Sequence, residues 1–125
     1  MIPSLNELSD AWKDRDGFVV ITTINQNNTP HAEYVVNISL IEEGIFVAAS
    51  ENLDKTRANI RNHSQGTLLF MTNAYQAYQV KGSLEIMESG EAFREYLNEF
   101  DSDLSSDNLI IFHITEAFSE DGKIY

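Results

Sequence analysis

The residues with the clearest capacity for chemistry lie in one short segment, 50–61. Three of the chain's eight basic residues, Lys55, Arg57 and Arg61, fall there, although the whole chain carries a net charge of −12. Thr56 adds a hydroxyl next to Lys55. We expect a short helix to start here directly after a strand, and free N–H groups at a helix start suit a phosphate group. The alternative is a solvated helix whose cations pair with acids such as Asp54.

Motifs for covalent or metal-dependent catalysis are missing. The chain has no cysteine, no Gly-x-Ser-x-Gly, no His-Glu-x-x-His and no glycine-rich phosphate loop. Its three histidines lie far apart, without the spacing of zinc ligands. We therefore predict no catalytic side chain and no metal site. An enzyme built on this chain would take its chemistry from a cofactor.

Charge and composition limit the partners. The strong acidity repels nucleic acid and anionic membrane surfaces, whose binding depends on Lys and Arg. No apolar run approaches the roughly 20 residues of a membrane span. The N-terminus lacks the basic and apolar stretches of a signal peptide, and there is no cysteine to form a disulfide. These features predict a single domain over residues 1–125 in the cytoplasm, with no nucleic-acid or membrane partner.

The elements that must position these residues are mostly strands. Ser4 and Glu7 form a capping box that predicts a helix over 4–15, and Gly17 is expected to end it. Asp54 is expected to cap the helix of the basic segment, and a third helix is predicted over 90–100. Patterns typical of strands cover 18–24, 31–41, 45–50, 66–72, 76–88 and 109–116. Hairpin-length links between most neighbouring strands favour an antiparallel barrel over βαβ units.

Alternation in two of these strands predicts the core. On 31–41, the face expected to point inward consists of Ala32, Tyr34, Val36, Ile38 and Leu40. The opposite face consists of His31, Glu33, Val35, Asn37 and Ser39. On 76–88, Tyr78, Val80, Leu84 and Ile86 are expected to face inward. Gly82 interrupts that face, as expected where another backbone comes close.

Several short motifs occur in an order and spacing typical of one family. They are Thr29-Pro30-His31, Lys55-Thr56 followed by Ala58-Asn59-Ile60, Tyr78-Gln79-Val80-Lys81-Gly82-Ser83, and Leu109 to Thr115. With these motifs the chain resembles the pyridoxamine 5'-phosphate oxidase-like FMN-binding split barrels, in particular their short FMN-binding protein branch. The resemblance covers about Trp12 to Thr115. It implies a mainly β fold, namely a six-stranded antiparallel split β-barrel of Greek-key type with short flanking helices.

The resemblance also implies a cofactor, FMN (flavin mononucleotide), and a homodimer. It places Lys55 and Thr56 on the phosphate and Lys81 in a further contact with the cofactor. The complete set of implied cofactor-binding residues is Tyr34, Val35, Val36, Asn37, Ala49, Ser50, Lys55, Thr56, Asn59 and Lys81. The second subunit is expected to close the pocket with residues near 100–106 and after Thr115.

Three functions follow as hypotheses. The first is a flavoprotein oxidoreductase that passes electrons from a nicotinamide or protein donor through FMN to a small acceptor. The second is a non-catalytic electron carrier or flavin-storage protein. The third is a family member that has lost its flavin and acts as an interaction dimer. Pyridoxamine 5'-phosphate oxidase activity itself is not expected, because the chain is short and lacks a second basic cluster for the phosphate of that substrate.

Overall fold

A computed structural model describes residues 3–42, 44–50, 52–98 and 108–125. The helices are α1 (Pro3–Lys13), α2 (Asp54–Arg61) and α3 (Glu91–Leu97). The strands are β1 (Arg15–Ile24), β2 (Pro30–Val35), β3 (Ile38–Glu42), β4 (Ile45–Ala49), β5 (Gly66–Thr72), β6 (Ala77–Met87), β7 (Leu109–Ser119) and β8 (Gly122–Lys123). None of the helices in this part of the chain is long and apolar enough to cross a membrane.

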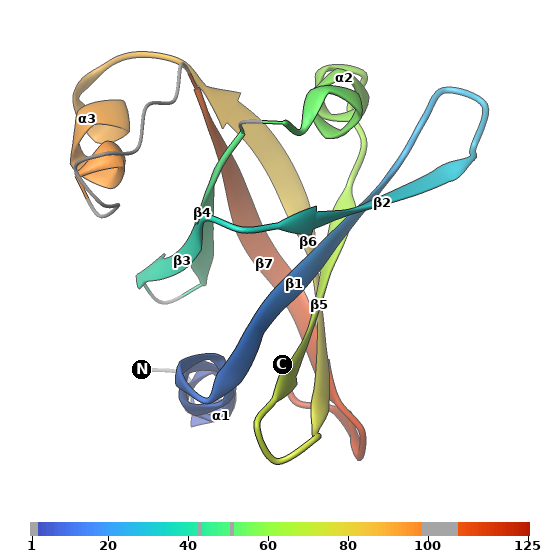
Figure 1. Cartoon of the computed structure of the whole chain (residues 1–125), viewed down its shortest axis with the longest axis vertical. Helices are drawn as coiled ribbons and strands as arrows, with labels where there is room; N and C mark the ends of the chain where they lie inside the picture. The colour runs from blue at the N-terminus through green and yellow to red at the C-terminus, as the bar shows by residue number, and fades with distance from the viewer. Residues whose placement is uncertain (1–2, 43, 51, 99–107) are drawn as a thin grey trace.

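The strands form one curled antiparallel sheet, which confirms the split-barrel prediction (Figure 1). Its order is β2-β1-β5-β6-β7-β4-β3, with β8 added on β7. The two edge strands of this order, β2 and β3, follow one another directly in the chain. One bent segment therefore forms both edges, and the sheet must curl to bring these edges to the two ends of the bend. At the bend the Ala49 N–H donates to the Asn37 carbonyl at 2.9 Å, which continues the pairing of β3 with β4 by one residue. The bend itself connects the two edges of the sheet along the chain.

The strand count differs from the prediction for two reasons. The predicted strand 31–41 is divided by the bend at 36–37, and the short β8 was not predicted. Other bounds agree closely, and β5 has the bounds expected for residues 66–72. Gly17 does not end the first helix. It lies within β1 at a positive φ of 104°, where the pairing of β1 with β5 shifts register.

The bend also makes part of the core prediction wrong. Tyr34 and Val36, expected inside, are 68% and 85% exposed, whereas Val35, expected on the opposite face, is 2% exposed. Ala32 is exposed as well. Past the bend the expectation holds, because Ile38 is buried. The physical reason is that the segment pairs with β1 before the bend and with β4 after it, so the alternation of faces shifts by one residue.

The core fills the inside of the curled sheet. Trp12 of α1 packs edge-on against Phe46 and Phe70, with ring centroids 4.8 Å and 5.0 Å apart. Burying each such side chain contributes about 1.5–3 kcal/mol. On the other face of β4 and β7, a smaller cluster of Val47, Leu109 and Ile111 packs against α3. Phe93, Tyr96 and Leu97 of α3 therefore pack against a core, while residues 99 and 100 of the predicted helix lie outside the described residues.

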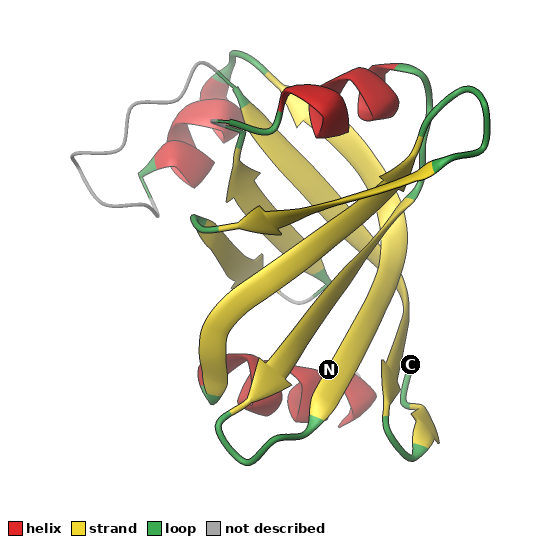
Figure 2. Cartoon of the chain, turned by 45° about the vertical axis from the view of Figure 1, so that its right-hand side comes forward, coloured by secondary structure: helices red, strands yellow, loops and turns green. Residues whose placement is uncertain are grey.

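Two helices cover the ends of the half-barrel. Figure 2 shows α1 across one end and α2 across the opposite end. The second helix begins differently from the prediction, because its N-cap is Leu53 and not Asp54. Asp54 is the first helical residue and pairs with Arg57. The end of the barrel under α2 is the end at which β2 bends and β4 finishes, so the basic segment and the bend are neighbours (Figure 1).

Candidate functional site

A cavity of about 120 Å³ lies at the bend. Its walls come from the end of β2, the bend, the end of β4 and the loop into α2. The lining residues are Tyr34, Val35, Val36, Asn37, Ala49, Asn52 and Leu53. Five of the predicted cofactor-binding residues, Tyr34 to Asn37 and Ala49, are therefore brought together in one place.

Asn52 and Leu53 were not predicted. They follow the end of β4, in a stretch to which the resemblance assigned no cofactor-binding residue. Asn52 adopts a positive φ of 64°, a conformation for which Asn is one of the favoured residues. An Asn between a predicted strand and a predicted helix was the available signal for a turn of this kind.

The cavity offers mainly apolar side chains and main-chain groups. Val35 and Leu53 are buried and form its inner wall, whereas Tyr34 and Val36 stand at its outer rim. The Asn37 carbonyl is already bonded to Ala49. Such a slot suits a flat, largely apolar ring that is held at its edge by hydrogen bonds. No Asp, Glu, His, Lys or Arg is among the described residues that line it.

Thr56 and Asn59 point from α2 toward the end of the barrel and do not line this cavity. The fully buried Thr56 donates its hydroxyl to the Oε2 of Glu33 on β2. The Asn59 Nδ2 donates to the Thr23 Oγ1 on β1 at 2.9 Å. Both hydrogen bonds satisfy buried polar groups and attach the helix to the sheet.

The three cations of the basic segment have different surroundings. Arg57 pairs with Asp54 and donates to the Ser50 carbonyl at 2.9 Å. Arg61 pairs with Glu88 at 3.0 Å. The exposed Lys55 takes part in no ion pair between described residues. The expectation that these cations pair with nearby acids thus holds for the two arginines, and Lys55 is the cation that the described acids leave to a ligand.

Ser50 and Lys81 also lie apart from the cavity. The buried Ser50 donates its hydroxyl to the Asn108 carbonyl at 2.9 Å, which connects the end of β4 to the start of β7. Lys81 is exposed on the outer face of β6, with its ammonium 5.1 Å from the centre of the Phe118 ring. Neither side chain belongs to the lining of the slot.

The outer face of the sheet carries an apolar groove of about 360 Å³ next to the cavity. Its lining includes Phe18, Val20, Leu69 and Met71, and it shares Tyr34 with the cavity. Phe18 and Leu69 are 69% and 47% exposed. A continuous apolar face of this kind is uncommon on a monomer and typical of an interaction surface.

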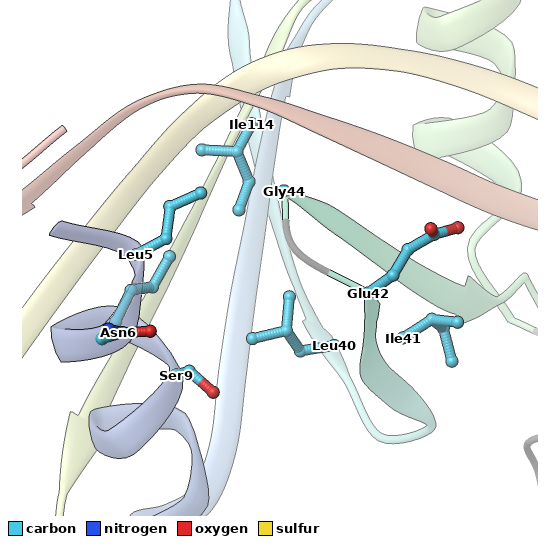
Figure 3. Close-up of a pocket in the computed structure, with 9 residues that line it drawn as sticks. Leu5, Asn6, Ser9, Leu40, Ile41, Glu42, Gly44 and Ile114 are labelled. Atoms are coloured by element: carbon cyan, nitrogen blue, oxygen red, sulfur yellow. The ribbon is translucent and has the colours of Figure 1, made fainter. Parts of the chain in front are cut away.

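Another cavity, of about 280 Å³, lies at the opposite end of the barrel, between α1 and the β3–β4 hairpin. Figure 3 shows Leu5, Leu40 and Ile114 pointing into it, while Ile41 and Glu42 point away. Asn6 and Ser9 of α1 also line it, and none of the predicted cofactor-binding residues does. Its position and lining therefore give it no connection with the basic segment.

The pKa values of two phenols, Tyr78 and Tyr96, are shifted, and neither side chain lines the slot. Burial raises the pKa of Tyr78, and Glu7, which accepts its hydroxyl hydrogen at 3.2 Å, raises it further. Burial and a hydrogen bond to Glu42 raise the pKa of Tyr96 in the same way. Both phenols therefore stay protonated at neutral pH and act as structural donors.

Comparison with known proteins supports the fold strongly. HupZ of Group A Streptococcus superposes with a TM-score of 0.80 at 17% identity, covering 94% of this chain and 95% of that one. An FMN-binding protein from Syntrophomonas wolfei gives 0.78 at 16% identity, covering 94% and 86%. A pyridoxamine 5'-phosphate oxidase-related, FMN-binding protein from Nostoc punctiforme gives 0.67 at 9% identity, covering 95% and 84%. At these identities the likeness shows a shared fold.

A search among curated proteins gives no match. The family model described as pyridoxamine 5'-phosphate oxidase, however, matches residues 5–119, which is nearly the whole chain. The matched range contains both walls of the slot, the basic segment and the outer apolar face. Sequence and fold lead to the same assignment, and the chain belongs to the pyridoxamine 5'-phosphate oxidase family.

Proposed function

We propose that this protein binds FMN in the slot at the bend and works as an oxidoreductase, passing electrons from a nicotinamide or protein donor to a small acceptor. One observation carries the proposal. The residues that the family resemblance assigns to the flavin ring, Tyr34 to Asn37 and Ala49, meet around one cavity beside the start of α2. We expect this activity in the cytoplasm, as the sequence predicts.

The chemistry of the slot fits a flavin. Its apolar inner wall accepts the ring, main-chain groups at the bend bind the edge of the ring, and Lys55 supplies a positive charge for the phosphate. When bound, FMN supplies the electron-transfer chemistry. The residues of the chain position the ring, exclude water from its inner side and set the charge near the phosphate.

The size of the slot supports a site that a second copy of the chain completes. Its volume of about 120 Å³ is below the roughly 300 Å³ at which small-molecule sites begin. The apolar groove next to it shares Tyr34, so a copy docked on that groove would extend the wall of the slot. We therefore propose a homodimer formed through the outer face of β1, β2 and β5.

The register of the sheet gives Lys81 a role in this dimer. Outward-facing Tyr34, Val20, Leu69 and Gln79 form one row across β2, β1, β5 and β6. A two-fold axis through the middle of this row sets β2 of one copy against β6 of the other. Lys81 lies on β6 level with Thr67, Thr22 and Ala32, so in such a dimer it would lie opposite Ala32 of the second copy, on the strand that leads into that copy's slot.

An absorption spectrum tests the proposal. One sample is the protein purified without added cofactor, and the other is the same protein after incubation with FMN and desalting. A heat-unfolded sample treated in the same way is the control. Retained bands in the visible region that are absent from the control support the FMN site. Colourless protein in both samples would contradict it and leave the interaction dimer as the leading function.

A second step separates the oxidoreductase from the electron carrier. NADH or NADPH is added to the loaded protein without oxygen. Loss of the visible bands supports a nicotinamide donor. If the bands persist and only a protein reductant removes them, a nicotinamide donor is excluded and the electron carrier is favoured.

A further inference from the structure

The Glu33 carboxylate lies between β2 and α2, and two groups surround it. Its Oε2 accepts the hydroxyl hydrogen of Thr56. Its Oε1 lies 3.4 Å from the Nε2 of His31, which has no hydrogen-bond partner among the described residues. The side chain of Glu33 is only 22% exposed. The Glu33 carboxylate is therefore held chiefly by the Thr56 hydroxyl and lies next to the Nε2 of His31, which is unpartnered in the described part of the chain.

This carboxylate borders the slot. Val35 lies two residues beyond Glu33 on the inward face of β2, and Leu53 lies one turn before Thr56 at the start of α2. Val35 and Leu53 both line the cavity. The contact between Glu33 and Thr56 therefore forms the next layer, immediately behind the inner wall and under the helix start.

We propose that Glu33 is a specificity residue of the flavin site, an internal anion that occupies the position of the cofactor's phosphate and must be displaced when FMN binds. This inference rests on the proposed FMN function. The shared chemistry supports it, because a carboxylate and a phosphate both accept hydrogen bonds from hydroxyl and imidazole donors. Thr56, which the family resemblance assigns to the phosphate, is fully buried and already donates to Glu33.

Displacement has a definite consequence for affinity. When Glu33 swings out, Thr56 Oγ1 and His31 Nε2 become two donors for phosphate oxygens, next to Lys55 in the first turn. Phosphate binding must break the existing hydrogen bond and overcome repulsion between like charges. A flavin without phosphate does not meet this opposition. Glu33 therefore lowers the preference of the site for FMN over riboflavin.

Five proteins test the proposal. They are the wild type, Glu33→Gln, Thr56→Val and the double variant, with Glu95→Gln as a control that removes the same charge from an exposed position on α3. Dissociation constants for FMN and for riboflavin are measured by quenching of flavin fluorescence, and circular dichroism checks folding. Gln is isosteric with Glu and still accepts the hydrogen of Thr56, so the variant keeps the local structure.

We expect Glu33→Gln to tighten FMN binding about tenfold and to leave riboflavin binding and the control unchanged. Because the Thr56 hydroxyl is expected to donate to the phosphate once residue 33 is displaced, Thr56→Val should remove most of this gain in the double variant. Equal effects on FMN and riboflavin, or no effect on either, would overturn the role of Glu33 while flavin binding stands. If neither the wild type nor Glu33→Gln binds any flavin, both this inference and the proposed function fail.

Discussion

At the scale of single residues, the site depends on which charges are already satisfied. Arg57 and Arg61 have carboxylate partners, and Thr56 has Glu33. Lys55 has no such partner among the described acids. A phosphate that approaches the start of α2 thus meets an acidic protein in which Lys55 is the cation of this helix that pairs with none of the described acids.

We expect Lys55→Ala to weaken FMN binding at least about tenfold, because it removes the main charge that faces the phosphate. Arg61→Ala is the matched control, since Arg61 lies on the same helix and is paired with Glu88. Titration of flavin fluorescence measures both variants. Equal losses in the two would mean that only the net charge matters and that the phosphate has been placed wrongly.

At the scale of elements, sequence alone predicted what depends on local pattern. Alternation and turn residues predicted the hairpins and the bounds of most strands, and β5 is an example. The bend escaped prediction because it arises when one segment changes partners from β1 to β4, a tertiary event that leaves no trace in the local pattern.

The same event explains what sequence reasoning missed in the site. The shift in alternation turns Glu33 toward α2, where it meets Thr56, and turns Tyr34 to the outer face. The family resemblance supplied the slot residues by position, but it contains no information on their neighbours in this chain. Ser50 and Asn59 illustrate this, because both side chains are buried and donate hydrogen bonds elsewhere in the fold. Ser50 donates to the Asn108 carbonyl, and Asn59 donates to Thr23.

Gly82 on β6 was expected to mark a close backbone approach, and the structure confirms it. A Cβ at this position would lie 2.2 Å from the His113 carbonyl oxygen on β7 and 2.6 Å from the Phe112 ring. We expect Gly82→Ala to lower the free energy of unfolding by about 1–3 kcal/mol or more, because β6 and β7 must separate to admit the methyl group.

Urea denaturation followed by circular dichroism measures this effect. Ser83→Ala, a change at the adjacent exposed position on β6, is the control. A midpoint for Gly82→Ala equal to that of the control would show that β7 yields without cost and that the close approach is not needed for stability.

At the scale of the whole molecule, the exposed apolar face decides the assembly. Leu69 lies near the centre of the outward row and is 47% exposed. We expect Leu69→Glu to weaken the homodimer at least about 100-fold, because the two-fold axis brings two carboxylates together in an apolar contact.

Sedimentation velocity over a range of concentrations measures the assembly, and Gln65→Glu at an exposed position outside the groove is the control. Loss of FMN affinity in parallel with loss of the dimer is expected, since the second copy is proposed to complete the slot. A wild-type protein that sediments as a monomer, with or without FMN, would contradict the dimer and the assignment of Lys81 to the second copy.

The position of β4 in the sheet has a consequence for synthesis of the protein. The β3–β4 hairpin can form as soon as it leaves the ribosome, but the other edge of β4 pairs with β7, which is made much later. Until then Val47, Ala48 and Ala49 present an open, apolar strand edge, which is a template for aggregation. Such long-range pairing is also slow to form. Nascent chains that stop before residue 109 should therefore be the species that chaperones hold and that precipitates first.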